Sequence, residues 1–146
     1  MRKLLIGLAL LGACTPTAHS TPIPNAVRRG AVGPAEAVNT FLIAAKREDL
    51  PTMNALWGTK DGPGRTEMKA EERDMRDIVV ARCLRHDSYE IVSDKMSING
   101  NHTLSVAVTR KSLTTSHDFI TAQGPDHRWY VQDAGIRNLT GICLQT

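Results

Sequence analysis

Residues 89–109 read YEIVSDKMSINGNHTLSVAVT and give the clearest indication of the fold class. From Leu104 to Val108, apolar residues alternate with small or polar ones, which is the period of a strand with one buried face. Asn99 and Gly100 come before this strand and are a strong hairpin signal, because both residues tolerate positive φ. The stretch therefore predicts two antiparallel strands joined at Asn99-Gly100.

Two further strands are expected downstream of this hairpin. The first covers residues 114–123 and is closed by the turn residues Gly124-Pro125-Asp126. The second covers residues 128–134. Side chains alternate along a strand, so Trp129, Val131 and Asp133 are expected on one face and Tyr130 on the other.

Upstream of residue 89 the apolar residues follow a helical period. A first helix is expected over residues 34–48, and a second is expected to begin at Pro51 and to end at Gly58. A turn-rich loop over residues 59–64 follows, and Thr66 is the expected N-cap of a third helix. The predicted buried stripes are Val38, Phe41, Leu42 and Ala45; then Met53, Leu56 and Trp57; then Met68, Met75, Ile78, Val79 and Cys83.

Helices followed by antiparallel strands predict an α+β domain. The chain of 146 residues is long enough for one domain, and its 41% hydrophobic content argues against disorder. A net charge of +3, spread along the chain, does not favour nucleic-acid binding.

The N-terminus has the pattern of an export signal. A basic head, Met1-Arg2-Lys3, precedes an apolar run over residues 4–11 that is too short to span a bilayer. Leu11-Gly12-Ala13-Cys14 resembles the bacterial lipobox. This resemblance implies removal of residues 1–13 as a signal peptide, a lipid on the Cys14 thiol, and a bacterial cell-envelope location. The outer membrane facing the periplasm is favoured, because Thr15 is not aspartate. The alternative is a plain secretory signal with an incidental cysteine.

The remaining chain divides into a tether and a domain. Residues 14–33 are rich in Pro, Gly and Thr and predict a flexible linker, whereas residues 34–146 predict the domain. With Cys14 taken by lipid, Cys83 and Cys143 are left in an oxidising compartment, which predicts a disulfide between them. The alternative is two separate buried thiols.

Residues 37–50, AVNTFLIAAKREDL, followed by Met53, Leu56 and Trp57, resemble the opening of NTF2-like (cystatin-like) domains. Trp129-Tyr130-Val131 is similar to a strand of their curved sheet. The resemblance implies a cone of three helices on a curved antiparallel sheet of about four strands, and it permits a homodimer. One departure is that the strand usual between the second and third helices is reduced to residues 55–59 or absent.

Some NTF2-like proteins are isomerases or dehydratases, so the resemblance alone does not give the function. Asp133 is the candidate acid or base, but no set of oxyanion donors accompanies it, since Tyr130 faces the other way. His117 and Asp118 face opposite sides of a strand, and His86-Asp87 and His102 are expected to be exposed. No pair of histidines has metal-ligand spacing, so no metal or cofactor is expected.

The leading expectation is a membrane-anchored, non-enzymatic domain that binds a small hydrophobic ligand or an envelope protein. Its pocket candidates are Trp57, Trp129 and Asp133, and no catalytic residue is assigned. One alternative is an enzyme acting on a hydrophobic small molecule through Asp133. The other is a structural or interaction domain whose core is filled by Phe41, Trp57, Met75 and Trp129.

Overall fold

The structure is a computed structural model that describes residues 29–64 and 68–136. In this part of the chain, helices α1 (Pro34–Arg47) and α2 (Leu50–Leu56) come first, followed by the short strands β1 (Gly58–Thr59) and β2 (Gly62–Pro63). Helix α3 (Ala70–Cys83) precedes β3 (Ser88–Met96), β4 (His102–Arg110), β5 (Leu113–Gln123) and β6 (Trp129–Asp133). The predicted α+β class is confirmed.

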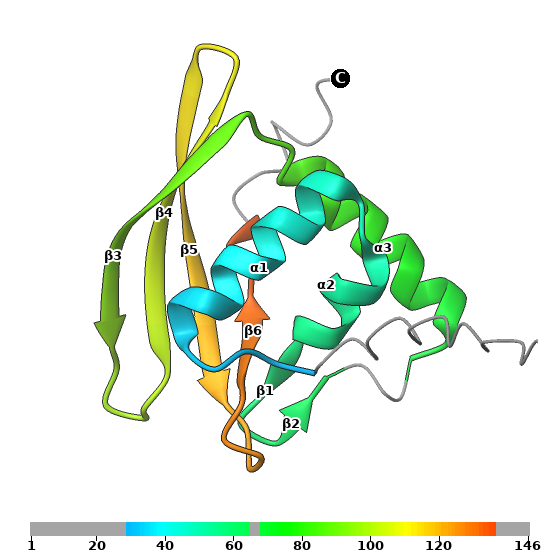
Figure 1. The fold of residues 1–146 in the computed structure, drawn as a ribbon, viewed down its shortest axis with the longest axis vertical. Helices are drawn as coiled ribbons and strands as arrows, with labels where there is room; N and C mark the ends of the chain where they lie inside the picture. Colours follow the sequence, from blue (N-terminus) through cyan, green and yellow to red (C-terminus); the bar gives the residue numbers. More distant parts are fainter. Residues whose placement is uncertain (1–28, 65–67, 137–146) are drawn as a thin grey trace, which may run out of the picture.

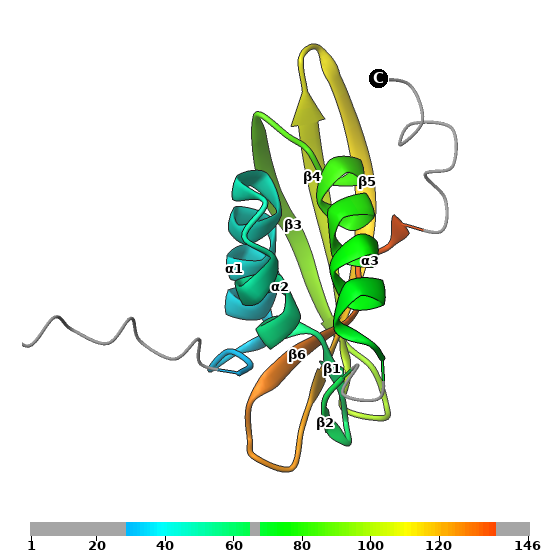
Figure 2. The same ribbon diagram turned by 90° about the vertical axis from the view of Figure 1, so that its right-hand side faces the viewer.

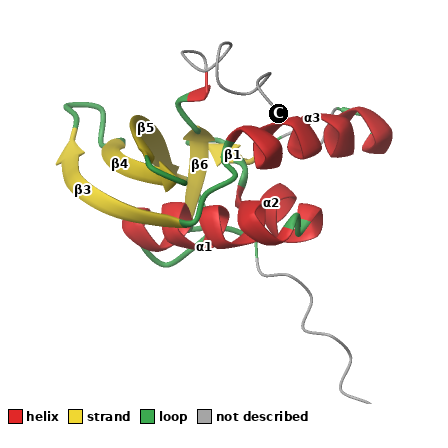
Figure 3. Ribbon diagram, turned by 90° about the horizontal axis from the view of Figure 1, so that it is seen from above, coloured by secondary structure: helices red, strands yellow, loops and turns green. Residues whose placement is uncertain are grey.

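Strands β3 to β6 form one antiparallel sheet in sequence order, and β1 and β2 form a separate hairpin. Figure 1 shows α1 lying across one face of the larger sheet. The strands curve around this helix when seen from above, and α3 lies beside α2 (Figure 3). Helices therefore cover the inner face of the sheet, and its outer face carries small polar side chains such as Ser105 and Ser116.

Individual residues account for both ends of helix α1. Pro34 occupies the first turn, where its missing N–H would have had no partner within the helix. Glu48 adopts a left-handed conformation with φ of 53° and donates its N–H to the last carbonyls of the helix. The Asp49 side chain then accepts a hydrogen bond from the Thr52 N–H and caps α2. The predicted break between two helices is confirmed.

The predicted buried stripe of α3 is wrong. Met75 and Val79 are 63% and 52% exposed, whereas Asp77 and Ala81 are buried. The small side chain of Ala81 permits close packing, and Asp77 accepts a hydrogen bond from the residue that follows α2. Contacts with another element therefore override the pattern within the helix. The helix begins at Ala70, and the predicted cap, Thr66, lies outside the described residues.

Residues 59–64, predicted as a loop, contain most of the β1–β2 hairpin. Trp57, just before β1, forms a parallel bridge with Val131 of β6, and Ala31 forms an antiparallel bridge with Trp129. The hairpin covers the outer side of β6, where Tyr130 is fully buried. Gly58 makes this possible, because a Cβ there would lie 2.5 Å from Tyr130 Cγ.

The turn between β3 and β4 differs in detail from the prediction. The Gly100 N–H donates to the Ser97 carbonyl at 3.0 Å, so Ile98 and Asn99 are the central residues of the turn. Gly100 has a φ of 82°, but Asn99 is not among the residues with positive φ. The hairpin exists as predicted, with glycine alone in the left-handed region.

Candidate functional site

Three buried aromatic side chains pack together between α1 and the sheet. The Phe41 ring packs edge-on against Trp57, with ring centroids 4.7 Å apart. On its other side Phe41 lies 6.4 Å from Phe119 of β5, again at a steep angle. All three are buried, and edge-to-face contacts of this kind stabilise a core beyond the area that they bury.

Trp57 also joins the end of α2 to α3 through a buried hydrogen bond. Its indole N–H donates to Asp77 Oδ1 at 2.9 Å, and Asp77 is fully buried. Sequence reasoning missed Asp77, because the stripe predicted for this helix contains no charged residue. Its burial depends on where Trp57 lies in space, and no local signal in the sequence reports that position.

His117 is a buried titratable residue on the inner face of the sheet. Its Nε2 lies 2.9 Å from the Thr115 hydroxyl, while its Nδ1 is buried without a partner among the described residues. Burial lowers the pKa of His117, and the adjacent carboxylate of Asp118 partly opposes this shift. Asp118 faces the other side of the sheet, where it accepts a hydrogen bond from Ser105 at 2.6 Å. The predicted opposite orientation of these neighbours is confirmed.

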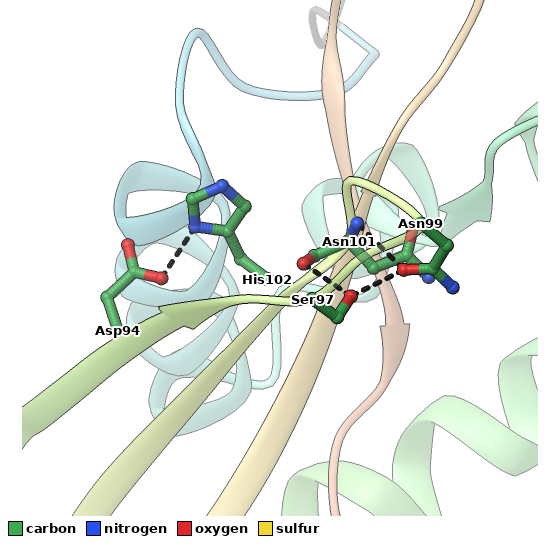
Figure 4. A network of polar contacts seen from close by, with 5 residues as sticks. All are labelled: Asp94, Ser97, Asn99, Asn101 and His102. Carbon is green, nitrogen blue, oxygen red and sulfur yellow. Dashed lines mark hydrogen bonds and ion pairs between the residues drawn. The ribbon is translucent and has the colours of Figure 1, made fainter.

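Trp129 is half-buried and packs against His102, with ring centroids 4.9 Å apart. His102 Nδ1 in turn lies 2.6 Å from Asp94 Oδ1 (Figure 4). Asp94 is paired with Leu104, and His102 lies two residues before Leu104, so both side chains share the inner face. The expectation that His102 is exposed is wrong. Its pairing was missed because a bulge near Val92 sets the register.

Asp133 does not continue the face of Trp129 and Val131. Val131 pairs with Thr121 but Asp133 pairs with Ile120, so β6 has one extra residue at this point. The bulge breaks the alternation on which the prediction depended, and the predicted shared face is wrong. Asp133 Oδ1 accepts a hydrogen bond from the Gly135 N–H at 2.9 Å. The three pocket candidates thus occupy three different environments.

A shallow depression lies on the outer surface between the end of α1 and the start of β3. Its volume is about 670 Å³, and it is lined by Ile43, Lys46, Arg47, His86, Asp87, Ser88 and Tyr89. His86 and Asp87 are both predicted to be solvated. The prediction is wrong for His86, which is buried with its Nδ1 2.7 Å from the Leu84 carbonyl, and it is confirmed for Asp87, which is exposed. The Lys46 ammonium donates to the Asp87 carbonyl and is thereby held at the rim.

The cysteine predictions fall largely outside the described residues. Cys83, at the end of α3, is disulfide-bonded. Cys14 and Cys143 both lie outside the part of the chain that the structure describes. The pairing of Cys83 with Cys143 and the lipid on Cys14 therefore stay predictions.

No protein-family model, curated protein or solved structure matches the chain. None of the helices in the described ranges combines the length and apolar character needed to cross a bilayer. Within the same ranges, no three His, Cys, Asp or Glu side chains are grouped to hold a metal ion. Inferences about function therefore depend on the chain's own residues.

Proposed function

We propose that the chain is a lipid-anchored protein of the bacterial envelope whose NTF2-like domain binds an envelope partner without catalysis. Three features support the NTF2-like assignment. The break at Asp49-Leu50 separates two helices, the β1–β2 hairpin takes the place of the strand expected between α2 and α3, and Trp129 and Val131 lie on the last strand. The lipobox-like Leu11-Cys14 supports attachment to the outer membrane, facing the periplasm.

The aromatic packing between α1 and the sheet is the observation that carries the non-enzymatic proposal. An enzyme with a conical domain needs space between helices and sheet for its substrate. Here the Phe41 ring packs between Trp57 and Phe119 in that region, and the Trp57–Asp77 hydrogen bond holds the indole in place. A binding partner would therefore contact the outer surface of the domain. On such a surface a protein makes a larger contact area than a small molecule does.

The residues considered for catalysis support the same proposal. Asp133 lies off the face of Trp129 and Val131, and one of its oxygens accepts from the Gly135 N–H. Tyr130 lies on the same outer face of β6 as Asp133, but its hydroxyl donates to Asp126 at 2.6 Å. An oxyanion site needs donors that converge on one point, and here the Tyr130 hydroxyl is bonded to another carboxylate.

One observation favours a second candidate, the binding of a small polar ligand in the interior. His117 Nδ1 and the Thr121 hydroxyl are both buried without a partner among the described residues. Buried polar groups are usually paired, so a ligand or a water molecule that reaches them would remove a cost. Such a ligand would carry hydrogen-bonding groups as well as apolar surface.

Native mass spectrometry of the mature protein separates the two candidates. For a partner-binding domain, we expect the mass of the lipidated chain with no stoichiometric small molecule. An adduct that is present in wild type and absent in His117→Leu would support the ligand candidate instead. Thr115→Val is the matched control, because it removes only the hydroxyl that lies next to His117 Nε2.

Membrane anchoring is tested by Cys14→Ser in the full chain. We expect wild type to fractionate with membranes and the variant to become soluble or remain unprocessed, because only the thiol can carry the lipid. Cys83→Ser is the control and should stay in the membrane fraction. A Cys14→Ser protein that is processed and still membrane-bound would contradict the proposed anchor.

A further inference from the structure

We propose that the β3–β4 hairpin is a membrane-contacting wedge, with Ile98 and Met96 entering the interfacial region of the bilayer that holds the anchor. This inference rests on the proposed lipidation of Cys14. The chemical partner is a phospholipid surface. The supporting observations concern the exposure, rigidity, position and charge of the hairpin.

Ile98 gains no burial from folding, and Met96 gains little. Their exposed fractions are 109% and 72%, and they are separated by a single residue. Ile98 occupies the first central position of the Ser97–Gly100 turn, where Pro is favoured and most other residues are compatible. Single exposed apolar residues need no explanation, whereas two together on one hairpin are a candidate contact surface.

The hairpin holds these side chains on a fixed backbone. The Ser97 hydroxyl lies within hydrogen-bond distance of both Asn99 Oδ1 and the Asn101 carbonyl, and the Asn101 N–H donates to the same Asn99 oxygen (Figure 4). The Ser97 N–H also donates to the Asn101 carbonyl at 2.8 Å. A turn fixed in this way loses little conformational entropy on docking, so its apolar tip is ready for insertion.

The hairpin lies at the end of the sheet where the chain leads back to Cys14. Ala31 is hydrogen-bonded to Trp129 through the backbone, the Trp129 ring contacts His102, and His102 pairs with Met96. Figures 1 and 2 show the start of the described chain and the β3–β4 turn toward the same end, with the β4–β5 turn at the opposite end.

The connecting segment is long enough to bring this end to the membrane. It spans 15 peptide units from Cys14 to Arg29 and reaches at most about 50 Å when extended. Val32, next to the Ala31 bridge, adds a further exposed apolar side chain at this end. The first described residues of the chain and the hairpin thus lie toward the same end of the domain.

The charges beside the tip fit a phospholipid surface. Lys95 is exposed directly before Met96, and a long lysine side chain can place its ammonium at the phosphate level while the apolar tip lies deeper. The neighbouring carboxylate of Asp94 lies 2.6 Å from His102 Nδ1, on the opposite face of β3 from Lys95.

The test uses the full lipidated chain in vesicles that contain brominated phospholipid, with one tryptophan added by Ile98→Trp. Leu113→Trp is the matched control, because Leu113 is also a large apolar residue, 56% exposed, but lies at the opposite end. We expect the added fluorescence of Ile98→Trp to be quenched at least threefold more than that of Leu113→Trp. Both variants should keep the thermal unfolding midpoint of wild type.

Several outcomes would overturn the wedge. Equal quenching of the two variants would show that the hairpin end is not directed toward the bilayer. An absence of quenching, together with a dimer mass for wild type that Ile98→Glu reduces to a monomer mass, would assign the tip to a second copy of the chain. If the protein does not float with the vesicles at all, the anchor proposal fails, and this result is distinct from flotation without quenching.

Discussion

Trp57 and Asp77 connect the end of α2 to α3 through one buried hydrogen bond. Asp77 is fully buried and accepts from the Trp57 indole at 2.9 Å. Loss of one partner of a buried hydrogen bond leaves the other group desolvated and unpaired. The bond therefore holds the indole against Phe41.

Asp77→Ala removes this acceptor, and we expect the free energy of unfolding to fall by about 2–3 kcal/mol. Urea unfolding followed by tryptophan fluorescence measures the change. Asp74→Ala, one turn earlier at an exposed position of α3, should change stability by less than about 0.5 kcal/mol. Equal effects of the two substitutions would contradict the proposed role of Asp77.

Gly58 is required by the close approach of β1 to Tyr130. A Cβ at this position would lie 2.5 Å from Tyr130 Cγ and 2.6 Å from the Gly62 carbonyl oxygen. We expect Gly58→Ala to destabilise the domain by about 2–3 kcal/mol, because neither the ring nor the hairpin backbone has room to move. Gly33→Ala is the control, since a Cβ added there would have no other atom within 4 Å. Thermal unfolding of the two variants measures the difference.

Among the elements, α3 shows that helical periodicity identifies a helix more reliably than it identifies the buried face. The helix forms over much of the predicted range, but Met75 and Val79 face solvent. Asp77 and Ala81 are buried because the partner surface offers an indole donor and a close contact. A charge-rich helix has a weak apolar stripe, so its contacts with neighbouring elements determine which face is buried.

Lysine substitutions test this orientation of α3. We expect Met75→Lys to change the free energy of unfolding by less than about 0.5 kcal/mol, as at other exposed positions. Ala81→Lys should cost at least about 3 kcal/mol, because it places a charge in a buried contact. Chemical denaturation of both variants measures the two losses of stability. A larger loss for Met75→Lys than for Ala81→Lys would show that Met75 is on the buried face, as the apolar stripe predicts.

Strand register is a second property of the elements that alternation alone does not give. One extra residue in β6 separates Asp133 from the Trp129–Val131 face, and one irregularity in β3 brings Asp94 beside His102. A bulge shifts every later side chain by one step. Both the main catalytic candidate and the His102 pair therefore depended on features that no local pattern reports.

For the whole molecule, His117 makes the free energy of unfolding depend on pH. Burial lowers its folded-state pKa, whereas the unfolded chain titrates near the usual value of about 6.5. As the pH falls below that value, the unfolded chain binds the proton first, so stability decreases. Above that value, both states are neutral and the residue makes no pH-dependent contribution.

We expect the free energy of unfolding of wild type to fall more steeply between pH 7.5 and pH 5 than that of His117→Leu. Urea unfolding at several pH values gives the two slopes. Thr115→Val serves as the control, because it changes the neighbour of His117 but keeps the titrating ring. Parallel slopes for wild type and His117→Leu would contradict the burial of a neutral imidazole.

Local features of the sequence were sufficient for the α+β class, the order of the main helices and strands, and the positions of the main breaks. Apolar periodicity, proline and glycine, and side-chain caps act over a few residues, so they can be read directly from the chain. The buried face of α3, the side of β6 that carries Asp133, and the partners of His102 and Trp57 became known only from the folded molecule. Those outcomes depend on contacts between residues far apart in the chain, such as Trp57 with Asp77, and on bulges that shift strand register.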